Sequence, residues 1–147
     1  MAILIFILII CTIIIAHELG HFLLAKANGI TVKEFFVGMG PTLCSFMKGG
    51  TKYSLKLFPI GGACVFEGED GRAEEDEDGE SIPLSEGAFP NANVWARIST
   101  VVAGPLFNFI LAYFLALIIV GTTYSDKPVI QGLIPGYAAE EAGMQPG

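Results

Sequence analysis

The chain has 147 residues, of which 52% are hydrophobic, and its formal net charge is −7. Ten of the 15 acidic residues fall between Glu67 and Glu86, so the negative charge is confined to one segment. Nothing in this charge distribution indicates a nucleic-acid partner. The hydrophobic share is only slightly above that of soluble domains, so the placement of the apolar residues, rather than their number, indicates the class of protein.

Two apolar blocks, residues 1–25 and 98–121, each reach the roughly 20 residues that a helix needs to cross a bilayer. The first block has no basic stretch before it, its apolar run is long, and no small-x-small site precedes a soluble domain. We therefore expect it to stay in the membrane rather than to be removed as a signal peptide. Seven of the eight basic residues lie between the blocks, and only Lys127 lies beyond them. The positive-inside rule therefore predicts a cytoplasmic connection and two extracytoplasmic chain ends.

The first block, within residues 1–27, contains the motif His17-Glu18-Leu19-Gly20-His21. On a helix, residues four apart share one face and lie about 6 Å apart along the axis. H-E-x-x-H on a helix is a zinc motif with two histidine ligands and a glutamate that acts as general base. The alternative, polar residues that happen to close a surface helix, is disfavoured because ionisable groups at membrane depth are costly. The motif predicts Zn2+ bound by His17 and His21, with Glu18 as the catalytic base.

Residues 28–66 predict a β-loop, because β-branched and aromatic runs and alternating apolar and polar residues follow one another there. Gly49 and Gly50 suit a tight hairpin turn. The glycine- and proline-containing stretch around Gly38 and Gly40 is expected to interrupt the strands. Two interpretations stay open: an ordinary surface hairpin, or a sheet that dips beside the metal and pairs with an extended substrate strand.

Residues 67–93 are acidic, marked by glycines and poor in large apolar side chains, which predicts a solvated, mobile linker. The segment lacks a recognisable oxygen-ligand loop for a cation. We therefore expect it to connect the β-loop to the second membrane span without a site of its own.

Residues 94–124 predict a second transmembrane helix, with Tyr124 as the outer end of an aromatic belt. Inside it, Pro105 lacks a backbone N–H and permits a kink. Asn108 lies three residues further on, on the same face of the helix. A buried asparagine needs a partner, which is either the other helix, or the metal or an unwound substrate strand. The sequence leaves these roles open.

Together these features resemble the site-2 protease family of intramembrane zinc metalloproteases, most closely the bacterial branch that cleaves anti-sigma factors (RseP-like). Residues 17–22 look like the active-site helix of that family. Residues 38–40 and 59–62 look like its membrane-reentrant β-loop, and residues 103–108 look like the start of its second helix. Residues 132–147 resemble the opening of its extracytoplasmic PDZ domain.

The resemblance implies a fold and a function. The fold is membrane α-helical: two transmembrane helices joined by a cytoplasmic reentrant β-hairpin and an acidic linker, with residues 125–147 as the truncated start of a PDZ-like domain. The implied function is regulated intramembrane proteolysis of single-span proteins in the bacterial inner membrane. Gly38, Gly40 and Asn108 would contact the substrate, and the PDZ-like part would bind a peptide or protein.

The sequence departs from the family in one respect. Family members carry a third zinc ligand, an Asp on a third transmembrane helix, and catalytic zinc requires three protein ligands. The resemblance therefore implies the N-terminal part of a protease, which by itself is inactive and binds zinc weakly or not at all. A non-catalytic membrane scaffold that uses its PDZ-like module is the alternative. A soluble-type enzyme tethered by one span is disfavoured by the unbroken apolar run that leads into His17.

Overall fold

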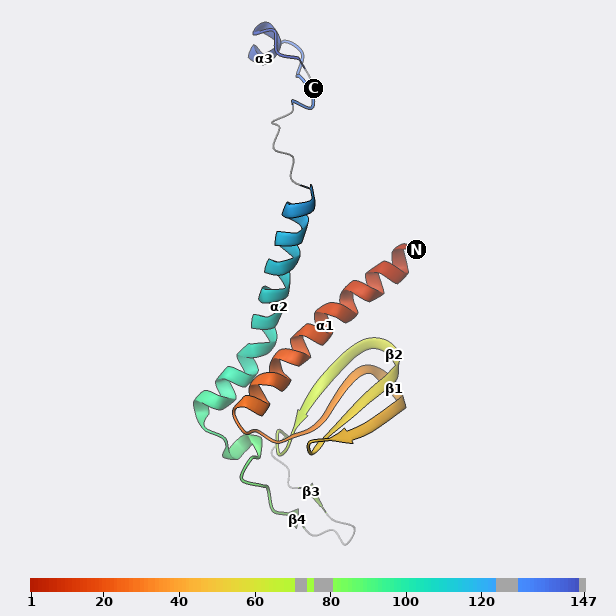
Figure 1. Cartoon of the computed structure of the whole chain (residues 1–147), viewed down its shortest axis with the longest axis vertical. Helices are drawn as coiled ribbons and strands as arrows, with labels where there is room; N and C mark the ends of the chain where they lie inside the picture. Colours follow the sequence, from red (N-terminus) through yellow and green to blue (C-terminus); the bar gives the residue numbers. More distant parts are fainter. Residues whose placement is uncertain (71–73, 76–80, 124–129, 146–147) are drawn as a thin grey trace. The chain divides into compact units, whose positions relative to one another are not determined.

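A computed structural model describes residues 1–70, 74–75, 81–123 and 130–145 (Figure 1). The chain divides into two compact units, Met1–Tyr113 and Phe114–Gly147. Its elements in order are α1 (Ala2–Ala27), β1 (Val32–Lys48), β2 (Thr51–Phe66), β3 (Glu74–Glu75), β4 (Ser81–Ile82), the 3-10 helix η1 (Phe89–Asn91), α2 (Val94–Thr123) and α3 (Ala138–Glu141). The expected aromatic edge at Tyr124 and the basic residue Lys127 lie outside the described residues.

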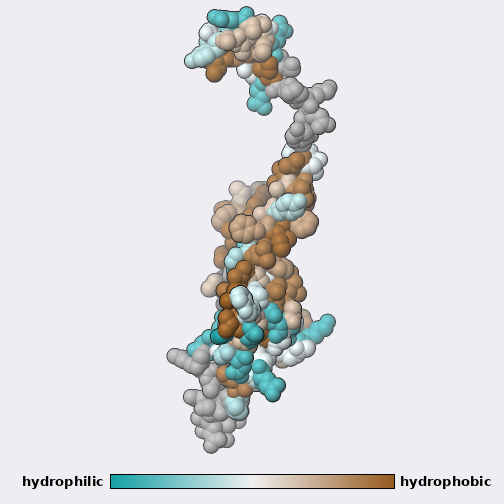
Figure 2. Space-filling model, turned by 90° about the vertical axis from the view of Figure 1, so that its left-hand side faces the viewer, coloured by the Kyte–Doolittle hydropathy of each residue, from teal (hydrophilic) through white to brown (hydrophobic). Residues whose placement is uncertain are grey.

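The two predicted apolar helices are present. α1 has 26 residues and α2 has 30, and both are long and apolar enough to cross a membrane. α1 ends at the predicted stop, with Asn28 as its C-cap and Gly29 at a φ of +73°. Large apolar side chains are exposed around both helices, and their surface is largely brown in Figure 2. A helix that is apolar on all sides is suited to a lipid environment.

β1 and β2 form the predicted antiparallel hairpin, with its turn at Gly49 and Gly50. Beside the turn, residues 42–48 lie opposite residues 51–56. The beginning of β1 has two neighbours, because residues 32–37 lie opposite residues 62–66 and also opposite part of the first half of β2. Residues 42–48 and 62–66 each have a partner on one side only among the described residues, so they form the two edges of the sheet.

The strands continue through the glycines that were expected to interrupt them. Gly38, Gly40 and Gly61 have φ values of +92°, +86° and +91°, which only glycine adopts readily. The register between the strands shifts repeatedly over this region. The glycines therefore bend the hairpin without ending its pairing, as β-bulges do.

A small hydrophobic core joins the end of α1 to the base of the sheet. Its partly buried border includes Phe89 of η1, whose ring stacks on that of Phe66 with the ring centroids 5.3 Å apart. The buried members are Ala25, Ile30, Val32, Cys64 and Phe66. Because this core begins one turn after His21, it fixes the sheet against the half of α1 that carries the H-E-x-x-H motif.

The expected linker is tied to this core at both of its ends. The Glu67 N–H donates to the carbonyl oxygen of Thr31 at 3.0 Å, and the Phe89 N–H donates to the carbonyl oxygen of Glu67 at 2.8 Å. The Glu67 carboxylate accepts from the N–H and the hydroxyl of Ser85 at 3.0 and 2.6 Å. These hydrogen bonds lower the pKa of Glu67 below its ordinary value. The ends of the segment are therefore anchored, and residues 71–73 and 76–80 lie outside the described part of the chain.

Candidate metal centre

α1 and α2 come closest at Gly20. A Cβ atom on Gly20 would lie only 2.4 Å from the backbone oxygen of Ala103, so only glycine fits at this crossing. Gly20 occupies a variable position of the H-E-x-x-H motif, one residue before His21. The close approach therefore brings both histidines of α1 against the backbone of α2.

Each histidine contacts α2 through its Nδ1 atom. His21 Nδ1 lies 2.8 Å from the carbonyl oxygen of Thr100. His17 Nδ1 lies 3.1 Å from Nδ2 of Asn108, two turns further along α2. The imidazole rings stand edge to face, with their centroids 4.8 Å apart and an interplanar angle of 79°. The two histidines therefore lie next to each other on one face of α1, as the sequence predicts.

The Nε2 atoms of both rings converge on Gly104. A Cβ atom on Gly104 would lie 2.4 Å from His21 Nε2 and 2.7 Å from His17 Nε2. The absent side chain thus leaves a space that both nitrogens border, and zinc–nitrogen bonds are about 2.0–2.1 Å long. The two imidazoles therefore offer two nitrogen ligands of the kind that zinc uses in proteins, on the same side of α2. Within the described residues, no group of three or more His, Cys, Asp and Glu side chains gathers, so a third protein ligand is not supplied there.

The Glu18 side chain lies beside the sheet. A Cβ atom on Gly62 would lie 3.5 Å from Cγ of Glu18 and 2.9 Å from the backbone oxygen of Phe36. Gly62 begins the sheet edge formed by residues 62–66. The carboxylate-bearing side chain therefore lies beside one edge of the hairpin, while the histidines lie against α2.

The other two predicted substrate residues lie within the bent part of the hairpin. A Cβ atom on Gly38 would lie 2.6 Å from the backbone oxygen of Phe58, and one on Gly40 would lie 2.8 Å from the Phe58 ring. Both glycines therefore allow close packing inside the sheet. Of the residues named as candidates from the sequence, His17, His21 and Asn108 come together, Glu18 lies beside the sheet edge, and the two glycines pack against Phe58.

Three contributors to the site carried no role in the sequence analysis. Gly20 permits the close approach of the helices, and Gly104 leaves the space beside the rings. The Thr100 carbonyl oxygen is the hydrogen-bond partner of His21 Nδ1. Gly104 lies within residues 103–108, the stretch that resembles the start of the second helix of the family. A glycine inside an apolar helix is a signal of close backbone approach, but the sequence does not show what approaches it.

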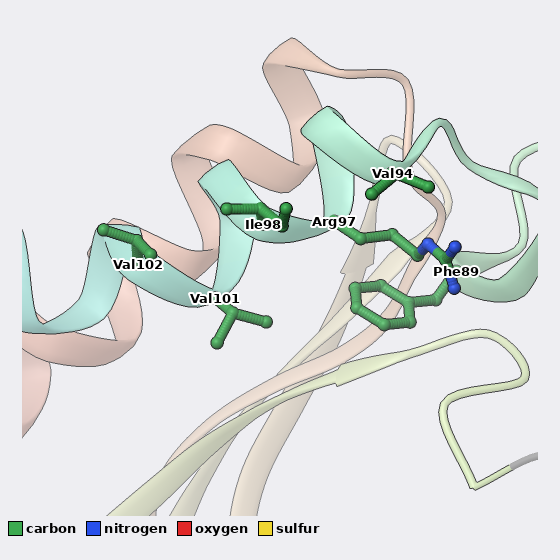
Figure 3. A pocket seen from close by; sticks show the side chains of 6 residues that line it. All are labelled: Phe89, Val94, Arg97, Ile98, Val101 and Val102. Atoms are coloured by element: carbon green, nitrogen blue, oxygen red, sulfur yellow. The ribbon is translucent and has the colours of Figure 1, made fainter.

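A separate pocket of about 340 Å³ lies where η1 meets the beginning of α2, and the two histidines are not among its lining residues (Figure 3). Most of its wall is apolar, and Nε of Arg97 is buried without a hydrogen-bond partner in the part of the chain that the structure describes. Its lining residues are Phe89, Val94, Arg97, Ile98, Val101 and Val102.

Two membrane-length apolar helices thus bring a pair of histidines together in the pattern of the H-E-x-x-H metallopeptidase motif. The chain belongs to peptidase family M50, the site-2 protease family, whose model matches residues 5–141. This confirms the family that the sequence motifs resembled.

Three relatives illustrate the match. The chain is 38% identical to a Thermotoga maritima protein with the provisional name zinc metalloprotease, over 100% of this chain and 28% of that protein. It is 37% identical to a similarly named Brucella suis protein, over 97% of this chain and 39% of that protein. It is 30% identical to the zinc metalloprotease RasP of Bacillus licheniformis, over 97% of this chain and 51% of that protein. The chain thus spans between about a quarter and half of the length of these relatives.

Proposed function

We propose that this chain is part of a zinc-dependent intramembrane endopeptidase that cleaves single-span membrane proteins, such as anti-sigma factors, in regulated intramembrane proteolysis. The observation that carries the proposal is the convergence of His17 Nε2 and His21 Nε2 on the space beside Gly104. In this proposal the third zinc ligand is an Asp on a further transmembrane helix, as the family resemblance implies.

The roles of the residues follow from their chemistry. His17 and His21 would hold Zn2+ through unprotonated Nε2 atoms. Zn2+ held there would supply Lewis-acid activation of water and of the peptide carbonyl. Glu18 would take a proton from the attacking water and return it to the nitrogen of the departing amine. Glu18 follows His17 in the chain and lies about 100° around the helix from it, so its side chain would have to rotate to bring the carboxylate to the metal side.

The substrate in this proposal is a transmembrane helix that unwinds locally. Unwinding frees backbone N–H and C=O groups, which have no water to bond inside a bilayer. The edge formed by residues 62–66 lies beside Glu18, and an extended segment added there would regain its hydrogen bonds. Gly38 and Gly40 would shape the loop that the substrate passes, and Asn108 stays a candidate contact to the substrate.

The exposed side chains of the hairpin fit a membrane-associated β-loop. Leu43, Phe46, Leu55 and Phe58 are each about half exposed, with exposed fractions of 59, 60, 47 and 57%. Large apolar side chains gathered on a surface indicate contact with lipid or with another protein. This exposure supports an interaction of the hairpin with the bilayer and with the substrate within it.

The orientation in the membrane is part of the proposal. The Lys26 ammonium group at the end of α1 donates to the carbonyl oxygen of Gly49 at 3.2 Å, so the basic end of α1 lies next to the hairpin turn. Lys48 and Lys52 flank the same turn. By the positive-inside rule this end faces the cytoplasm of a bacterial inner membrane, with both chain ends outside and the PDZ-like part able to bind a peptide or protein.

A Glu18→Gln substitution in the full-length protein tests the proposal. We expect bound zinc to remain at about one ion per chain while cleavage of a model single-span substrate is lost, because the histidines are unchanged and the proton acceptor is removed. His21→Ala should remove both zinc and cleavage. Cleavage that survives in Glu18→Gln would show that the base is wrongly assigned. Absence of zinc from the unaltered protein would favour the non-catalytic scaffold.

A further inference from the structure

The hydrogen bond that His21 makes on α2 determines which of its ring nitrogens carries the proton. His21 Nδ1 lies 2.8 Å from the Thr100 carbonyl oxygen, which can only accept. His21 must therefore donate from Nδ1, and the neutral ring keeps its lone pair on Nε2. This is the tautomer in which Nε2, the atom that faces Gly104, can bind a metal.

His17 has a different partner, which has two chemically distinct ends. Its Nδ1 lies 3.1 Å from Nδ2 of Asn108, while Oδ1 of Asn108 is buried without a hydrogen-bond partner among the described residues. If Nδ2 donates to Nδ1, the neutral His17 ring carries its proton on Nε2. A protonated Nε2 has no lone pair to offer, so His17 and His21 would hold opposite tautomers and only His21 could bind a metal.

We propose that Asn108 is a positioning residue for His17: with its carboxamide turned by half a rotation, Oδ1 accepts the proton of His17 Nδ1 and leaves Nε2 free. The inference rests on the proposed metalloprotease function. The half-turn exchanges Oδ1 and Nδ2 without moving other heavy atoms. In either orientation one of the two amide atoms of Asn108 has no hydrogen-bond partner among the described residues, so the number of hydrogen bonds does not favour one orientation over the other. The proposed metal centre favours the turned orientation, because it requires an unprotonated Nε2 on both rings.

This role is distinct from the substrate contact expected from the sequence. A residue that only held substrate would leave the tautomer of His17 unchanged in the substrate-free protein. An acceptor behind a ligating histidine fixes its ring orientation and raises its basicity, and loss of such an acceptor typically lowers metal affinity about 10- to 100-fold. Asn108 on α2 would thus do for His17 what the Thr100 carbonyl does for His21.

The chain contains only two histidines, so ¹⁵N NMR of histidine-labelled protein in lipid nanodiscs resolves both rings. At alkaline pH, where imidazole is neutral, we expect the proton on Nδ1 in both. Asn108→Asp keeps an acceptor oxygen and should keep that tautomer. Asn108→Ala should move His17 toward the Nε2-protonated form, and Asn108→Leu, which preserves the branched shape of the side chain, should do the same.

Titration of the full-length protein with Zn2+ alone gives a second readout. We expect the apparent affinity to fall about 10- to 100-fold in the alanine and leucine variants and to be retained in Asn108→Asp. Asn28→Ala is the matched control, because the Asn28 amide also bridges the helices, to the Ser99 hydroxyl at 3.1 Å, without touching a histidine. It should change neither tautomer nor affinity.

Two results would overturn the role of Asn108: an Nε2-protonated His17 in the unaltered chain, or an unchanged His17 tautomer in the alanine and leucine variants. A different result tests the proposed function. If both rings carry the proton on Nδ1 and yet the full-length protein, which supplies the proposed third ligand, binds no zinc, the metal centre fails while the effect of Asn108 on the tautomer stands.

Discussion

Replacement of Gly104 by alanine tests the metal centre directly, because the added methyl group would enter the space between the two rings. Its Cβ would lie 2.4 Å from His21 Nε2 and 2.7 Å from His17 Nε2, whereas ordinary van der Waals contact begins near 3.4 Å. At least one ring must therefore retreat by about 1 Å. Zinc–nitrogen distances tolerate only about 0.2 Å of deviation, so the pair of ligands would be lost.

The expected effects on binding and on folding differ in size. Loss of a hydrogen-bond partner behind a ligand lowers metal affinity about 10- to 100-fold, and displacement of the ligands themselves should exceed about 100-fold. Overpacking lowers the free energy of unfolding by about 1–3 kcal/mol. The higher helix propensity of alanine over glycine raises it by about 0.8–1.0 kcal/mol. Gly104→Ala should therefore fold with a modest loss of stability, yet fail to bind zinc.

The assay is a zinc titration of the protein in lipid nanodiscs, paired with a thermal melt followed by circular dichroism. Gly121→Ala is the control, since it makes the same change in the same helix where a Cβ would meet nothing within 4 Å. It should leave zinc affinity unchanged. Zinc binding in Gly104→Ala that equals that of the unaltered protein would refute the convergence of the histidines on this space.

Further substitutions test the surroundings of the site. In Gly20→Ala the Cβ would lie 2.4 Å from the Ala103 backbone oxygen, so the helices must separate, and both zinc affinity and the melting temperature should fall. The pKa of Glu67 is lowered by its hydrogen bonds to Ser85, so its contribution to stability is present above its ordinary value of 4.5 and is lost as the pH falls through the lower folded value. The protection of the Ser85 amide from hydrogen exchange, taken relative to its intrinsic rate at each pH, should fall on acidification, and Glu67→Gln should abolish that change in protection. Gly38→Ala places a side chain at a φ of +92°, which should cost about 1–3 kcal/mol and lower the melting temperature; an unchanged melt would contradict the backbone argument.

Local sequence signals predicted the elements well, because each depends on residues that are close in the chain. Helix periodicity placed His17 and His21 on one face, and Asn28 with Gly29 marked the end of α1. Two consecutive glycines marked the hairpin turn. The glycines further along the strands were misjudged as interruptions, because a positive φ either ends a strand or bends it, and only the pairing partners determine which.

The linker shows a second limit of local reasoning. Its acidic composition predicted solvation, and composition does not reveal that Glu67 bonds to Ser85 or that Phe89 stacks on Phe66. These contacts join residues about 20 positions apart. Their existence depends on the small core at the base of the sheet, which forms only when α1, the hairpin and η1 have come together.

By itself the sequence determined the chemistry that is available: two membrane-length helices, two imidazoles one turn apart and a carboxylate beside them. The tertiary structure decided where that chemistry is directed. The crossing at Gly20 brings residues about 80 positions apart into contact, so Gly104 opens the space between the rings and Asn108 meets His17. No helical periodicity specifies such a crossing, because it arises from the fit of one backbone against another.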